Sequence, residues 1–195
     1  MRRLLGIALL AGVSGCGADT PGENVVFQRR NPDLSWTQPA VLLTIGNTQS
    51  GGSIAWDPQE GFGVAAIEHS NDTLQYVNNQ KFPDGGPDET KWNTSTTIFG
   101  SGSGGWYPSL AMDPIYHEPA VAFYICSKRA GVAEGTCNAA EDELKVIQRI
   151  SGVWREELVD SAGGYLPKLG FFPDGKRVVA YRLPKTGNVR LAVEH

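Results

Sequence analysis

The sequence has little charge, little histidine and no long apolar run, and each scarcity excludes a class of protein. Only 19% of the 195 residues are charged, and the formal net charge is −4. Nucleic-acid binders need a basic face, so nucleic acid is excluded as a partner. The three histidines have no metal-ligand spacing, and no glycine-rich loop leads into a helix to hold a phosphate. We therefore expect neither a metal nor another cofactor.

The N-terminal residues 1–15 have the pattern of a signal peptide. Two arginines follow the initiator methionine, and Leu4–Val13 is an apolar run of ten residues. A membrane-spanning helix needs about 20 apolar residues, whereas a signal-peptide core needs about 7–15. No other segment of the sequence is apolar enough to cross a membrane.

The four residues after this run carry a resemblance to a known class of protein. Val13-Ser14-Gly15-Cys16 resembles the lipobox of bacterial lipoproteins, in which the cysteine is lipidated and becomes the new N-terminus. The resemblance implies a lipid anchor on Cys16 and a tether over residues 16–23. The absence of Asp after that cysteine implies the outer membrane of the cell envelope. An ordinary cleaved secretory signal with an incidental cysteine is the alternative.

The remaining chain, residues 24–195, contains an internal repeat of about 57 residues. Ser53-Ile54-Ala55-Trp56-Asp57-Pro58 matches Ser109-Leu110-Ala111-Met112-Asp113-Pro114, and a weaker copy occupies residues 168–173. A glycine pair precedes each copy. The chain holds 24 Gly and 12 Pro, which separate short segments rich in β-branched and aromatic residues. This pattern predicts an all-β domain.

Each repeat unit contains four such segments, which we interpret as four antiparallel strands. The second begins at Val64, Val121 and Val179, and a tryptophan opens the fourth, at Trp36, Trp92 and Trp154. Four strands in every 50–60 residues are typical of a propeller blade. We expect the three tryptophans to play one shared role, filling the gap between neighbouring sheets.

The repeats resemble those of secreted bacterial β-propellers of the broad sialidase-like superfamily. The resemblance implies a partial β-propeller of about three four-stranded antiparallel blades, with a small β-sandwich as the alternative fold. The Asp-box of sialidases, Ser-x-Asp-x-Gly-x-x-Trp, is absent from the sequence, so no functional residue is carried over.

The predicted strands do not fill a closed ring, because the last unit lacks its fourth strand. Closed propellers have about 4–8 blades, more than this chain supplies. The N-terminal fourth strand could complete the last unit, as in many propellers. The alternatives are an open array, self-association of two chains into a ring of about six blades, or a truncated relative of a longer protein.

Two of the three cysteines flank an insertion in the second unit. Cys126 and Cys137 have ten residues between them, and outside the cytoplasm such a pair most often forms a disulfide. We predict a disulfide that closes this loop, and not a metal site, since no histidine lies nearby to complete the shell.

No residue stands out as catalytic. Asp57 and Asp113 occupy equivalent positions before proline, which favours a turn role. Glu68 and Tyr124 occur once at their positions and could face a central funnel. Five aromatic residues near the blade entrances form a candidate binding face, which core packing would explain equally well: Trp56, Trp106, Tyr107, Tyr165 and Phe172.

Two functions follow from this sequence. The first is a lipid-anchored binding or scaffold module, attached to the membrane through Cys16, with a glycan or protein ligand. The second is a carbohydrate-active hydrolase of the sialidase-like kind, which needs arginine and carboxylate groups converging on one axis. The missing Asp-box favours the module, so we lean away from an enzyme.

Overall fold

The computed structural model describes residues 24–44, 51–68, 73–100, 104–125, 142–183 and 185–195. These residues form fourteen β-strands and no helix. No helix among them is long and apolar enough to span a membrane. The strands are β1 (Asn24–Phe27), β2 (Ala40–Thr44), β3 (Gly52–Asp57), β4 (Gly61–Glu68), β5 (Thr73–Lys81), β6 (Pro87–Trp92), β7 (Thr96–Phe99), β8 (Trp106–Met112), β9 (Pro119–Ile125), β10 (Glu143–Ile150), β11 (Val153–Asp160), β12 (Tyr165–Phe171), β13 (Arg177–Arg182) and β14 (Val189–Val193).

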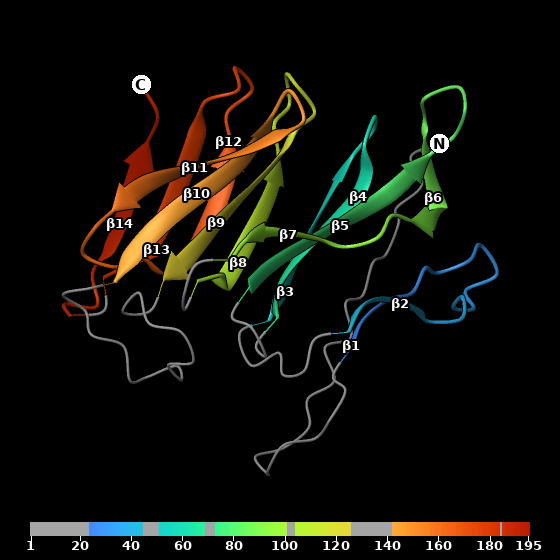
Figure 1. Cartoon of the computed structure of the whole chain (residues 1–195), viewed down its shortest axis with the longest axis horizontal. Coiled ribbons are helices and arrows are strands. Elements are labelled where there is room, and N and C mark those ends of the chain that lie inside the picture. The colour runs from blue at the N-terminus through green and yellow to red at the C-terminus, as the bar shows by residue number, and fades with distance from the viewer. Residues whose placement is uncertain (1–23, 45–50, 69–72, 101–103, 126–141, 184) are drawn as a thin grey trace, which may run out of the picture.

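The strands make four small antiparallel sheets, numbered here in chain order. Sheet 1 is β1–β2, sheet 2 is β3–β4–β5 with β6 and β7 both on β5, sheet 3 is β8–β9–β10–β11, and sheet 4 is β12–β13–β14. They follow one another across the molecule, from sheet 1 at one end to sheet 4 at the other (Figure 1). The predicted all-β fold with blade-like sheets of a partial β-propeller is confirmed, and the two sheets of a sandwich are not what the strands form.

The core lies between successive sheets, not within one of them. Three clusters of buried side chains join sheet 1 to sheet 2, sheet 2 to sheet 3, and sheet 3 to sheet 4. The second strand of each inner sheet is covered on both faces, which is why all of β9 is buried. Such strands are continuous apolar runs, without alternation between polar and apolar residues.

Glycine and serine set how closely neighbouring sheets approach: the glycines lie against the third strand of the preceding sheet, and the serines join first strands. A Cβ on Gly164 would lie 2.2 Å from Cβ of Leu144, and one on Gly105 would lie 3.1 Å from Cβ of Leu74. The Ser53 hydroxyl accepts a hydrogen bond from the Leu110 amide at 2.9 Å, and the Ser109 hydroxyl accepts one from the Leu169 amide at 2.9 Å. The glycines and serines that recur in the sequence therefore make contacts that recur between neighbouring sheets.

All three tryptophans occupy the same ladder position, by which we mean the same place in the cross-strand pairing of their sheets. Each lies opposite the end of the third strand of its sheet, in the pairs Arg30↔Trp36, Asn79↔Trp92 and Arg149↔Trp154. Only Trp154 opens the fourth strand, however. Trp92 ends the additional strand β6, and Trp36 precedes β2, because three residues that are not in a strand separate each of these two from the strand that follows.

The predicted shared packing role holds for two of the tryptophans. The Trp92 ring lies 5.0 Å from that of Phe27 on sheet 1, and the Trp154 ring lies 5.2 Å from that of Tyr76 on sheet 2. Each therefore packs on the preceding sheet. Trp36 is 44% exposed, and the prediction is wrong for it, because among the described residues no sheet precedes sheet 1.

Sheet 4 keeps three strands in this structure. The N-terminal strand β2 pairs with β1 and not with β14, and the two lie at opposite ends of the array (Figure 1). The proposed closure of the ring by the N-terminal strand within one chain does not occur here.

Candidate binding surface

The five aromatic residues of the predicted binding face divide between the two ends of the sheets. Trp106, Tyr107 and Tyr165 lie at the end where β8 and β12 begin, which we call the loop end. Trp56 and Phe172 lie at the opposite end, which we call the turn end, where β3 and β12 finish. Trp56 donates a hydrogen bond to Glu89 at 3.3 Å, and Phe172 is 43% exposed. The structure therefore brings together three of the five.

At the loop end a tyrosine cluster joins sheets 3 and 4, consisting of Tyr107, Tyr124 and Tyr165. The Tyr107 and Tyr165 rings are 4.7 Å apart and edge to face, and their hydroxyl oxygens are 3.0 Å apart. The Tyr124 ring lies 5.9 Å from that of Tyr165. Tyr107 and Tyr165 are half-buried and pack against the core cluster that contains Trp106, which is itself buried.

A β-bulge in β8 orients Tyr107, and β12 has an equivalent bulge after Tyr165. The pairing of β8 with β9 is irregular between Trp106 and Ser109, and Tyr107 there has a φ of 52°. The same irregularity occurs in β12, where Leu166 has a φ of 51°. A bulge bends its strand and turns a side chain out of the regular alternation. Tyr107 is turned in this way toward the neighbouring sheet.

Tyr124 is the buried member of the cluster and a hydrogen-bond donor. Its hydroxyl donates to the Asp142 carboxylate at 2.6 Å, and both side chains are buried. Burial, together with the hydrogen bond and the charge of Asp142, raises the pKa of Tyr124 far above its usual value. The phenol therefore stays protonated, which is the opposite of what a nucleophilic tyrosine requires.

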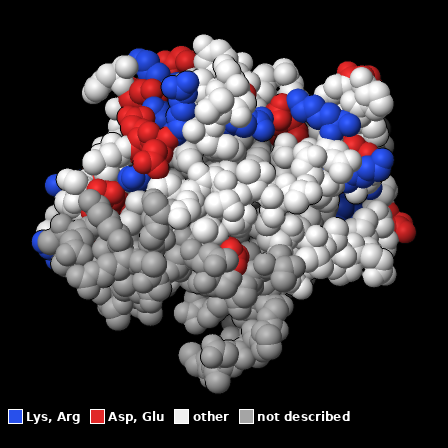
Figure 2. All heavy atoms as spheres, in the orientation of Figure 1, with Lys and Arg blue, Asp and Glu red and all other residues white. Residues whose placement is uncertain are grey.

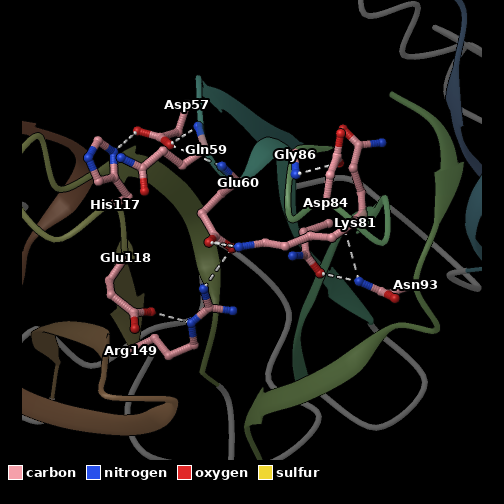
Figure 3. A network of polar contacts seen from close by, with 12 residues as sticks. Asp57, Gln59, Glu60, Lys81, Asp84, Gly86, Asn93, His117, Glu118 and Arg149 are labelled. Atoms are coloured by element: carbon pink, nitrogen blue, oxygen red, sulfur yellow. Dashed lines mark hydrogen bonds and ion pairs between the residues drawn. The ribbon is translucent and has the colours of Figure 1, made fainter. Parts of the chain in front are cut away.

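The turn end carries a network of polar contacts between sheets 2 and 3 (Figure 3). His117, in the turn after β8, lies with Nδ1 at 2.8 Å from the Asp57 carboxylate. Arg149, at the end of β10, donates to Glu118 through Nε and to Glu60 through Nη2, the latter at 3.0 Å. The contacts His117–Asp57 and Arg149–Glu60 are partly buried and cross between sheets 2 and 3, whereas Arg149–Glu118 lies within sheet 3.

The predicted turn role of the two repeated aspartates is confirmed. The Asp57 carboxylate accepts hydrogen bonds from the Gln59 and Glu60 amides, and Asp113 accepts them from the amides of Ile115 and Tyr116. Sequence reasoning did not foresee the second contact of Asp57, with His117. No local pattern signals it, because His117 is 60 residues away.

Charged side chains gather along the turn end (Figure 2). Lysine, arginine, aspartate and glutamate are interspersed there, and the middle of the face in view carries few of them. Some of these charged groups, such as Arg149 and Asp57, make the contacts between sheets 2 and 3 described above. The tyrosine cluster offers a ligand aromatic rings and hydroxyls.

Several predicted residues lie outside the described part of the chain, among them Cys16, Cys126, Cys137 and His69. The lipid anchor and the disulfide therefore stay predictions. Within the described residues, no three His, Cys, Asp or Glu side chains converge as metal ligands would. No protein-family model matches the chain, and no curated protein matches it.

Proposed function

We propose that this protein is a lipid-anchored binding module of a bacterial cell envelope, held in the outer membrane through Cys16, that recognises a glycan without catalysing a reaction. The lipobox-like motif supports the anchor, since two or more acyl chains give stable membrane attachment. Incorporation of a labelled fatty acid into the full chain, and its loss in Cys16→Ser, is the expected result. Equal labelling of both proteins would contradict the anchor.

The single observation that carries glycan binding is the Tyr107–Tyr165 pair at the loop end. A tyrosine ring offers an apolar face for the C–H groups of a sugar and a hydroxyl that both donates and accepts hydrogen bonds. The two rings fix each other edge to face at 4.7 Å. Because they are already ordered, binding costs little further side-chain entropy.

The cluster supports binding better than hydrolysis. A sialidase-like enzyme would use an activated tyrosine or a pair of carboxylates beside the sugar. Within the tyrosine cluster, Tyr124 lies against the Asp142 carboxylate, is 2% exposed and is kept protonated by burial. The partly exposed Tyr107 and Tyr165 contact each other through their hydroxyls.

The test uses the full chain in detergent on a glycan array. We expect binding to a restricted set of glycans and a loss of about tenfold or more in Tyr107→Ala, which removes one ring. The matched control is Tyr116→Ala at the turn end, where the side chain is 75% exposed and binding should be unchanged. Equal loss in both variants, or retention of no glycan, would refute glycan recognition. Release of a fluorophore from glycosides would favour the hydrolase.

A further inference from the structure

The outer face of sheet 4 carries a row of exposed apolar side chains on β14, with Lys168 and Arg182 beside them, in a place where sheets 2 and 3 are covered. Along β14 the residues at alternate positions, Val189, Leu191 and Val193, point to one face and are 76%, 65% and 41% exposed. Contiguous exposed apolar side chains of this kind mark interaction sites. No described element of the chain covers this face, and none of its residues belongs to the core cluster between sheets 3 and 4.

The strand register shows that this face corresponds to buried faces in sheets 2 and 3. Leu191 pairs with Ala180, as Tyr76 pairs with Ala65 and Val146 with Ala122. Tyr76 is 4% exposed and Val146 is 2% exposed, against 65% for Leu191. Two residues earlier on the third strand, Val189 is the equivalent of Leu74 and Leu144, which are both fully buried. The same ladder positions are therefore core in two sheets and exposed in the last.

Sheet 1, at the other end of the array, has a tryptophan that lacks the packing surface its equivalents have. In sheets 2 and 3 the tryptophan opposite the third strand packs on an aromatic residue of the preceding sheet, Phe27 or Tyr76. Trp36 occupies this ladder position in sheet 1 but is 44% exposed. The equivalent of Tyr76 on sheet 4 is Leu191. Trp36 and Leu191 are thus the two halves of a contact that the internal sheets make.

The hydrogen bond between first strands is also missing on sheet 4, as it would be if the neighbouring sheet had no first strand. Ser109 accepts a hydrogen bond from the next sheet. Its equivalent in sheet 4 is Lys168, because Ser109 pairs with Ala122 and Lys168 pairs with Ala180, which is the equivalent of Ala122. Lys168 cannot accept such a bond. Sheet 1 consists of the third and fourth strands alone and has no first-strand amide to offer.

We propose that sheet 4 of one chain binds sheet 1 of a second copy, with Trp36 of the second copy packed on Leu191 and Val189. Such a contact is head to tail, and it forms a ring if it closes and a filament if it does not. Two copies would bring together eight sheets, which is within the size range of closed propellers. This inference does not depend on the lipid anchor or on glycan recognition.

The first experiment maps the contact in the membrane. The full chain carries a photoreactive benzoylphenylalanine in place of Trp36, and irradiation should give a cross-linked dimer whose attachment site lies within residues 189–193. The control carries the same group in place of Tyr116, in the turn between β8 and β9. A dimer no more abundant than in this control, or attachment elsewhere, would overturn the proposal.

The second experiment tests the head-to-tail arrangement by mixing two variants of the full chain in detergent. Trp36→Glu puts a charge on the binding face of sheet 1, and Leu191→Glu puts one on the binding face of sheet 4. Each variant alone should therefore associate at least about tenfold more weakly than the wild type. In a mixture, each chain still carries the face that the other lacks, so dimers should return. Both substitutions are at exposed positions, and unchanged circular dichroism verifies folding. A mixture that stays monomeric would refute the head-to-tail contact.

Discussion

At the residue scale, charged groups in this protein act mainly as links within and between sheets. Arg177 on β13 donates from Nη2 to Glu157 of sheet 3 at 2.7 Å and to Glu194 at 3.0 Å. The Arg177 hydrogen bond holds the pKa of Glu194 below its usual value, although burial opposes the shift. A carboxylate with a lowered pKa stabilises the folded state above its unfolded pKa, and this contribution is lost as the pH falls through the folded pKa.

We predict that Glu194→Gln flattens the acid dependence of folding. Wild-type stability should include the ion pair above about pH 4.5, the usual pKa of the group, and lose it at lower pH. The variant should be less stable at neutral pH by about 1 kcal/mol or less, because Glu194 is 43% exposed and solvent screens the pair. Urea unfolding at a series of pH values measures this. Parallel curves for the two proteins would contradict it.

At the element scale, the first strands of neighbouring sheets are joined by a hydrogen bond that recurs with the repeat. In one sheet a serine hydroxyl accepts from the amide of a leucine in the next, at Ser53–Leu110 and at Ser109–Leu169. Neither amide belongs to the serine's own sheet, so the bond resists separation of the sheets. Loss of the hydroxyl would leave a partly buried amide without this acceptor.

We expect Ser53→Ala and Ser109→Ala to cost similar amounts, about 1–2 kcal/mol of unfolding free energy each. The two serines lie at different interfaces, so their effects should add in the double variant. The matched control is Ser161→Ala at an exposed position, which should change stability by less than about 0.5 kcal/mol. Chemical denaturation of the wild type and the four variants measures this, and a control as costly as the two single serine variants would refute the role.

At the scale of the whole molecule, the sheets form a linear stack in which each contacts its neighbours. Ion pairs at the turn end and core clusters between the sheets hold this stack together, and Arg149 of sheet 3 binds both Glu60 of sheet 2 and Glu118 of its own sheet. Stability in such arrays is approximately a sum of unit and interface terms, and terminal units need a polar outer face to stay monomeric. Sheet 4 presents Val189 and Leu191 instead, which is why the proposed self-association belongs to this scale.

The local part of this structure was predictable from the sequence. Turn residues, β-branched runs and a period of about 57 residues predicted the strands, the all-β class, and the turn role of Asp57 and Asp113. These properties depend on residues close together in the chain, whose backbone preferences and hydrogen bonds act within one turn or one strand.

The contacts between sheets were not predictable in the same way. Nothing near His117 indicates its approach to Asp57, and nothing near Tyr107 indicates its pairing with Tyr165, 58 residues away. The sequence by itself determined which segments become strands and that they recur in matched groups. Only the tertiary structure decided which recurring positions are covered, because burial of Tyr76 or exposure of Leu191 depends on whether another sheet is present beside it.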